Sequence, residues 1–475
     1  MHETALIFPE AGMEKVTGFA RLFEPKHGIP LDRQEFSNTD LRKLIIPIII
    51  EQFLAMLVGL ADTLMISYAG EAAVSGVSLV NQLNNVFILV FTALASGGAV
   101  VASQYMGRGD RKDGSLASGQ LVMITTAISI ILTAVSLFFG KQILGLLFGS
   151  VEQDVMDASA EYLRITAYSF PFLAVYNGCA GLFRSMGKTK AVMNVSIAMN
   201  LINVLGNAVG IFVLHAGVAG VAWPSFISRV FAAAVTFVWV FNRDNPLYVT
   251  WKGLLGWNGG MQKRIFRIAI PNSIENGLFQ LSKVALSSIV AMFGTVQIAA
   301  NGVAQSFWSV AALFNMAMGP AFITVIGRYM GAGDKEGAEY YADKLLRLTI
   351  IGSFLWCVIF FILTFPLLKL FDISAEAKNL VIWLCLMHNI GCFLFCPTAF
   401  SLSNGLRAAG DVTYTMFAAI FSTVVCRVAF SYLYGVVLEW GVMGIGLAMV
   451  TDWFIKATLI HIRYRSGKWK NFNVI

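Results

Sequence analysis

Residues 104–110 read QYMGRGD, and residues 328–334 read RYMGAGD, nearly the same heptapeptide 224 positions later. The segment PIIIE (47–51) recurs at the same offset as PNSIE (271–275). Residues 47–110 therefore align with residues 271–334 without a gap. The chain is a tandem duplication, and the fold must accommodate two similar halves.

The repeat extends toward the end of each half. FRSMGK (183–188) pairs with LRAAGD (406–411) at an offset of 223, and GVAGVA (217–222) pairs with GVMGIG (441–446) at 224. Each copy thus covers some two hundred residues, enough for several helices at the ~1.5 Å rise of each residue.

Composition indicates that these helices lie in a membrane. Of 475 residues, 57% are hydrophobic and 13% are charged, and the mean hydropathy is +0.71, whereas about a quarter of the residues in soluble domains are charged. The net charge of +7 is typical of basic loops on the cytoplasmic side of a membrane protein, so we expect no nucleic-acid partner. The six cysteines lie in apolar segments, which gives no indication of a disulfide framework.

Apolar runs long enough to cross a hydrocarbon core, about 20 residues each, number twelve. We predict an all-α membrane protein with an N-terminal segment (1–40), a six-helix bundle (41–241), a polar linker (242–264), a second six-helix bundle (265–464) and a basic tail (465–475). Because six is even, both copies insert with the same orientation, and a pseudo-two-fold axis along the membrane normal should relate them. The predicted spans are 43–67, 75–104, 117–139, 160–183, 190–214, 217–241, 265–292, 297–326, 344–369, 378–405, 412–436 and 441–463.

Basic residues gather in the loops that follow the second, fourth, sixth and eighth spans, and in the tail. Acidic residues such as Glu152 and Glu439 occupy the opposite loops. The positive-inside rule then predicts that both termini are cytoplasmic.

These motifs resemble the multidrug and toxic compound extrusion (MATE) transporters. The resemblance rests on the proline, glutamate and DT pair of the first span, the GxGD after spans two and eight, and LRAAGD after span ten. It implies a V-shaped pair of six-helix bundles in the cell membrane that expels amphipathic, often cationic compounds in exchange for H⁺ or Na⁺. It also implies a monomer in the lipid bilayer that acts on small molecules, is not an enzyme and needs no cofactor besides the coupling ion.

Asp62, in GLADTLMISYAG (59–70), is an isolated carboxylate in the first span. An ionised acid inside a span costs several kcal/mol on insertion scales, which favours a functional role over a neutral structural one. It matches the first-span aspartate that the family links to its coupling cation.

Two further acids and two prolines are candidates. Glu51 lies about three helical turns before Asp62 and is either a second polar element of the path or nearer the cytoplasmic mouth. Glu275 is its repeat equivalent, and the resemblance implies that an acid in this span binds a cation; we assign both to cation coupling. Pro47 and Pro271 are candidates for conformational change, although a proline near a helix start needs no such role. Lys283 is too far along its helix to pair with Glu275. It could stand in for a coupling cation, but a structural pair elsewhere is the favoured interpretation.

Amide side chains form the expected substrate or cation path. Asn200, Asn203 and Asn207 recur at three- and four-residue spacing and make one polar stripe, to which we add Gln82 and Gln305. The stripe should face the interior of the first bundle, close to Asp62, because lipid-facing amides lack hydrogen-bond partners. One branch of the family carries an aspartate where this chain has Asn207. An amide binds Na⁺ or substrate but does not titrate, so this difference argues against a two-aspartate proton site.

Other polar residues are expected to be structural. Arg427 and Asp452 should form an ion pair. His388, Cys392 and Cys396 share a helix face, but the outer two are about 12 Å apart, too far to hold one metal. An intramembrane enzyme would need a nucleophile–base pair or HExxH, and the sequence has neither. The alternative cargo is a lipid-linked or peptide-like metabolite, which basic residues facing the cavity would favour.

Overall fold

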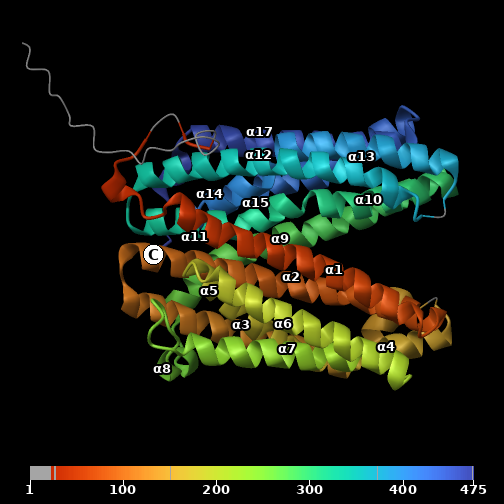
Figure 1. Ribbon diagram of the computed structural model, residues 1–475, viewed down its shortest axis with the longest axis horizontal. Coiled ribbons are helices and arrows are strands. Elements are labelled where there is room, and N and C mark those ends of the chain that lie inside the picture. Colours follow the sequence, from red (N-terminus) through yellow and green to blue (C-terminus); the bar gives the residue numbers. More distant parts are fainter. Residues whose placement is uncertain (1–22, 26–27, 150, 372, 473) are drawn as a thin grey trace, which may run out of the picture.

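The computed structural model describes residues 23–25, 28–149, 151–371, 373–472 and 474–475. Residues 1–22 of the predicted N-terminal segment lie outside them. Every regular element among the described residues is helical, and eleven of these helices are long and apolar enough to cross a membrane. Figure 1 shows two stacked bundles, with α8 and the C-terminus at the same end of the molecule.

The first bundle contains seven helices and a π-helical extension, and the linker contains one short helix. They are α1 (Asn38–Ser67), α2 (Glu71–Arg108), α3 (Arg111–Phe148), α4 (Gln153–Tyr168), α5 (Phe170–Ser185), α6 (Thr189–Ala208) continued by Val209–Val213, α7 (Ala219–Val240) and α8 (Trp251–Leu255).

The second bundle follows the same order, with π-helical segments inside two of its spans. Its helices are α9 (Gly259–Val290), α10 (Thr295–Ala311), α11 (Leu313–Gly331), α12 (Lys335–Leu368), α13 (Ala375–Cys396), α14 (Ser403–Ala409), α15 (Val412–Ala419), α16 (Arg427–Tyr432) and α17 (Gly441–Arg465). The π-helical segments are Pro397–Leu402, Ile420–Cys426 and Leu433–Val437, and 3₁₀ turns occupy Leu31–Arg33, Ala291–Phe293 and Lys468–Asn471. The predicted all-α, two-bundle architecture is confirmed.

The span predicted at 160–183 is not one continuous helix. It divides at Ser169 into α4 and α5. Pro171 has no N–H to donate to the carbonyl one turn earlier and its ring crowds that carbonyl, which ends a helix. Each piece has 16 residues, too short to count as a membrane span alone, so the described residues contain eleven candidate spans instead of twelve. The span predicted at 297–326 also divides, at Ala312, into α10 and α11, but together these cover the length of one span.

The repeated heptapeptide is one of the places where the two bundles touch. A Cβ atom on Gly107 would lie 1.8 Å from the carbonyl oxygen of Arg328, and one on Gly331 would lie 1.9 Å from that of Gln104. Gly107 and Gly331 are equivalent in the repeat, and so are Gln104 and Arg328. The two contacts are thus one contact seen twice, which is what the predicted two-fold relation requires, and only glycine permits this approach of α2 to α11.

Side-chain hydrogen bonds repeat the same symmetry. Gln104 Nε2 donates to Ala408 O at 2.7 Å, and Arg328 Nη2 donates to Ser185 O at 3.2 Å. Ala408 and Ser185 are also repeat equivalents. We call this end of the molecule, where both motifs lie, the motif end; there the bundles are held together.

The segment that leads into α1 also crosses between the bundles at the motif end. Arg33 pairs with Asp334, and with Glu336 at 2.9 Å, and Tyr341 Oη donates to Phe36 O at 2.5 Å. Burial tends to raise the pKa of Asp334, but hydrogen bonds from Arg33 and from the Gly337 amide outweigh it and hold that pKa below its ordinary value.

The linker is more ordered than its polar sequence indicates. Helix α9 begins at Gly259 rather than at the expected 265. Gln120 of α3 donates to Gly253 O at 2.7 Å and to Gly256 O at 2.5 Å, so the linker is bound to the first bundle.

Candidate functional site

A cavity of about 390 Å³ lies between the bundles, beside the crossing of α2 and α11. We call it the central cavity. Apolar and small residues alternate on its wall with many polar ones, a lining that suits amphipathic ligands. Its polar and charged residues are Gln52, Thr92, Ser96, Asn177, Arg184, Asn272, Glu275, Asn276, Asn315, Thr324, Asn404, Arg407, Thr423 and Lys456.

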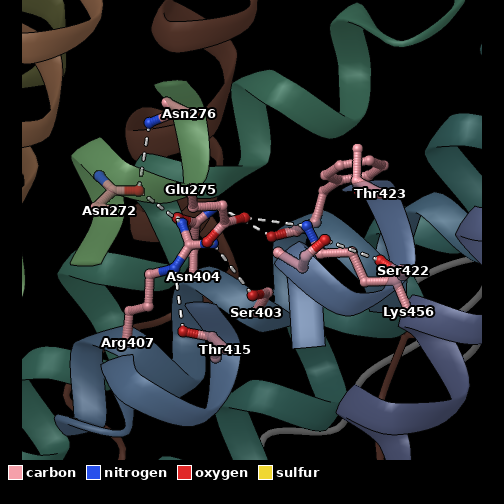
Figure 2. A network of polar contacts seen from close by, with 12 residues as sticks. Asn272, Glu275, Asn276, Ser403, Asn404, Arg407, Thr415, Ser422, Thr423 and Lys456 are labelled. Carbon is pink, nitrogen blue, oxygen red and sulfur yellow. Dashed lines mark hydrogen bonds and ion pairs between the residues drawn. The ribbon is translucent and has the colours of Figure 1, made fainter. Parts of the chain in front are cut away.

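Glu275 forms ion pairs with two basic side chains on the second-bundle side of this cavity (Figure 2). Arg407 Nη2 lies 2.6 Å from Glu275 Oε2, and Lys456 Nζ lies 3.1 Å from Oε1. Amide oxygens complete the surroundings of Arg407, because Nη1 donates to Asn272 Oδ1 and Asn404 Oδ1 at 3.2 Å each. A buried carboxylate shared by two cations can remain ionised at a bearable cost.

The first bundle carries a simpler copy of this arrangement. Arg184 Nη2 donates to Glu51 Oε1 at 2.5 Å, and Glu51 and Arg184 are the repeat equivalents of Glu275 and Arg407. The position equivalent to Lys456 is Ala232, so Glu51 has one cationic partner where Glu275 has two.

The sequence prediction missed all three cations. Arg184 and Arg407 could have been found, because FRSMGK and LRAAGD keep the arginine while their neighbours change. Lys456 gave no comparable signal, since only the packing of α17 against α9 brings it to Glu275.

Asp62 lies in a separate polar cluster inside the first bundle. Asn207 Nδ2 donates to Asp62 Oδ1 at 2.7 Å. In the amide orientation that pairs donors with acceptors, Asn203 donates to Asp62 Oδ1 at 2.9 Å and accepts from Ser225 Oγ at 3.0 Å. The predicted proximity of the asparagine stripe to Asp62 is confirmed for these two residues. Asn200 belongs to the same stripe but has a buried Nδ2 without a hydrogen-bond partner among the described residues.

Arg229 on α7 supplies the positive charge of this cluster. It interacts electrostatically with Asp62 and Tyr162, and its Nη1 donates to Ser169 Oγ at 2.6 Å. Sequence reasoning missed Arg229, although it is the single basic residue of its span. In the repeat Leu286 replaces Asp62, so this acidic cluster exists once per chain.

The two prolines lie inside helices rather than at helix starts, and the alternative that placed Pro47 near a start is wrong. Pro47 cannot donate to Lys43 O, and Thr189 Oγ1 on α6 donates to that oxygen instead, at 2.9 Å. Helix α1 is therefore tied to α6 at its proline. Pro271 occupies the equivalent interior position in α9.

The remaining predicted residues lie apart from Asp62. Arg427 and Asp452 form the expected buried pair at 2.8 Å. Gln305 donates to Met449 Sδ at 3.7 Å, whereas Gln82 is exposed on α2. Lys283 contradicts its favoured interpretation, because it forms no ion pair with a carboxylate among the described residues and lies instead 4.9 Å from the Phe279 ring centroid.

This chain is similar to one protein family, to curated relatives and to solved structures. The sequence matches the MatE family over residues 47–209 and again over 271–433, once in each half. It is 27% identical to the uncharacterized transporter YisQ of Bacillus subtilis over 89% of this chain and 93% of YisQ, and 26% identical to the probable multidrug resistance protein NorM of Thermotoga maritima over 95% and 96%. Its fold matches an outward-facing multidrug resistance MATE family transporter of the MOP superfamily with a TM-score of 0.84 and 19% identity, covering 96% of this chain and all of that one.

Proposed function

The chain belongs to the MATE family of transporters, and from that membership we propose that it exports amphipathic small molecules in exchange for H⁺ or Na⁺ by alternating access. The observation that carries the exchange is the single acidic cluster at Asp62. We further propose that it acts as a monomer in the cell membrane with both termini in the cytoplasm. The NorM relatives, named as probable multidrug resistance proteins, support drug-like cargo.

The Asp62 cluster has the donor and acceptor chemistry that a coupling ion needs. Two amide nitrogens donate to the carboxylate of Asp62. Na⁺ prefers oxygen ligands, and the cluster offers them in the carboxylate, the Ser225 hydroxyl and Asn207 Oδ1, which is buried without a hydrogen-bond partner among the described residues. A proton on Asp62 instead removes the negative charge and turns Oδ2 into a donor, while Oδ1 can keep both amide hydrogen bonds.

Helix α1 connects this cluster to the central cavity. Asp62 does not line that cavity, but Gln52 does, and Glu51 holds Arg184 at its edge. The eleven residues from Glu51 to Asp62 span about 16 Å of helix. A change in the charge of Asp62 can therefore reach the cavity through the packing of α1 against α6, which Thr189 anchors at Lys43. An ion and a cargo that favour different packings of α1 exchange for one another by population shift.

Closure at the motif end determines which side of the cavity opens. The contacts of Gly107 and Gly331 hold α2 against α11 there, so release of these contacts is the step that exposes the cavity to the side of the termini. With both termini in the cytoplasm, as proposed above, the structure represents the state that releases cargo outward.

A second candidate function is the export or flipping of a lipid-linked or peptide-like metabolite. Arg184, Arg407 and Lys456 all line the central cavity, and basic side chains suit the anionic groups of such cargo.

Purified protein in liposomes tests the proposal. A fluorescent amphipathic dye is loaded inside, and an inward H⁺ gradient or an inward Na⁺ gradient is imposed separately. We expect one gradient to accelerate dye efflux and the matching ionophore to abolish the acceleration. Efflux that neither gradient changes, while a lipid-linked probe is translocated, would support the second function instead.

A further inference from the structure

A second cavity, of about 280 Å³, lies within the second bundle between α9, α10, α16 and α17. We call it the C-bundle pocket. Its polar side chains include Lys283, Asn301, Gln305, Trp308 and Arg427. Trp308 also lines the central cavity, so the two spaces are neighbours.

The pocket has a surplus of positive charge. Arg427 is neutralised by Asp452 at 2.8 Å, but Lys283 has no carboxylate partner among the described residues. Both cations lie against one aromatic ring, because Lys283 Nζ is 4.9 Å and Arg427 Cζ is 5.5 Å from the Phe279 centroid. Two cations on one ring repel each other, and an unpaired lysine in a membrane span is costly. A bound anion would offset both costs.

The polar atoms left unsatisfied in this lining are donors. Arg427 Nε and Trp308 Nε1 are buried and have no hydrogen-bond partner among the described residues. The Arg427 side chain is only 2% exposed, so water cannot readily serve as its acceptor. Lys283, whose side chain is exposed, adds further N–H groups to the lining. A buried donor without an acceptor destabilises the fold, and a carboxylate, sulfonate or phosphate supplies several acceptor oxygens at once.

The polarity is opposite to that of the first bundle. The repeat places Gly59 at the position of Lys283 and Asp62 at the position of Leu286. One bundle therefore presents an acid and the other a base within neighbouring turns of equivalent helices. Apolar residues such as Ile445 and Met449 complete the pocket, so it suits a headgroup that carries an apolar body.

We propose that the C-bundle pocket binds the anionic group of an amphipathic cargo, with Lys283 as its principal contact and Arg427 and Trp308 as further donors. The proposal rests on the export function and specifies its substrate class as amphipathic anions or zwitterions. The apolar part of the cargo extends past Trp308 into the central cavity. Asp62 is left to the coupling ion.

The test measures binding of two fluorescent probes to purified full-length protein: anilinonaphthalene sulfonate, which is anionic, and ethidium, which is cationic. Lys283→Met removes the charge and keeps the length of the side chain, Lys283→Arg keeps the charge, and Lys369→Met is the matched control, because Lys369 is exposed at the end of α12. We expect Lys283→Met to weaken sulfonate binding at least about tenfold, which equals about 1.4 kcal/mol. Ethidium binding should change less than about twofold, and Lys283→Arg and Lys369→Met should bind the sulfonate like the original protein.

Equal weakening of both probes, unchanged sulfonate binding in Lys283→Met, or no sulfonate binding by the original protein would each overturn the proposal. If Lys283→Met does not fold, Lys283→Gln gives the same comparison. Gradient-driven efflux of ethidium without sulfonate binding would leave the export function intact and refute only this inference. Translocation of a fluorescent phosphatidylglycerol, compared with efflux of the soluble sulfonate, identifies whether the anion comes from a lipid or from a soluble cargo.

Discussion

Glu275→Gln removes the one carboxylate that two buried cations share. Arg407 keeps neutral acceptors, because Asn272 and Asn404 oxygens remain at 3.2 Å. Lys456 loses the carboxylate charge at 3.1 Å and keeps, among the described residues, the Phe400 ring 4.5 Å away and at best the neutral amide oxygen of the glutamine. The side chain of Lys456 is 3% exposed, so the variant leaves a buried and unpaired ammonium.

Breaking a buried ion pair by removing one partner costs about 3–5 kcal/mol. Two cations depend on this carboxylate, so we place the loss at the upper end of that range. At about 2–4 °C per kcal/mol for a domain of some 200 residues, Tm should fall by ~10 °C or more. Glu51→Gln is the matched comparison, because it leaves one basic side chain without its carboxylate partner. That side chain is Arg184, which is 19% exposed. The cost of Glu51→Gln should be nearer to ~2 kcal/mol, the value of a hydrogen bond to a charged group.

Thermal unfolding of purified protein in detergent measures both losses. Adding Lys456→Met to Glu275→Gln should restore about half of the lost stability, because the stranded charge is then removed, and a double-mutant cycle isolates this coupling. The reasoning is refuted if Glu275→Gln costs no more than Glu51→Gln, or if Lys456→Met deepens the loss.

Two further predictions concern the motif end. Gly107→Val should prevent the close contact of α2 with Arg328 and increase thiol labelling of a cysteine introduced at that end at least about tenfold. The control is Gly145→Val, at a helical glycine with nothing within 4 Å of its Cβ position, which should change neither labelling nor efflux. Equal labelling in both variants would contradict the closure assigned to this crossing. Because the pKa of Asp334 is lowered from 3.8, its contact with Arg33 contributes stability above that unfolded-state value and loses it as the pH falls through the folded-state pKa. Proteolytic release of the segment before α1 should therefore begin only below about pH 4. Release should depend less on pH in Asp334→Asn, which keeps the contact of Arg33 with Glu336, and a midpoint between pH 5 and 8 would contradict this assignment.

Sequence patterns predict this fold well because its main determinants are local or repeated. Length and hydropathy locate the spans, and the offset of 224 relates the halves before any contact is known. The failure at span four is also physical. Hydropathy continues through Ser169, whereas the backbone cannot, since Pro171 interrupts the hydrogen-bond ladder.

The sequence pattern could place some residues of the candidate sites but not others. Asp62 and Asn207 could be placed together because the stripe on one helix and the acid on another both had to avoid lipid. Lys456 could not be placed beside Glu275, since only the packing of α17 against α9 brings the two together. The unpaired state of Lys283 depends on the packing of four helices, which one sequence does not specify.

The exchange of an ion for cargo at Asp62 is tested most directly by counting ions released when cargo binds. Purified protein in weakly buffered detergent solution is titrated with a saturable amphipathic probe while the pH is recorded, and displacement of radioactive Na⁺ is measured in parallel. We predict release of about one H⁺ or one Na⁺ per bound probe, no release from Asp62→Asn, and normal release from Asp157→Asn, whose acid is exposed. Undiminished release from Asp62→Asn would contradict the account and transfer the coupling to Glu51 or Glu275.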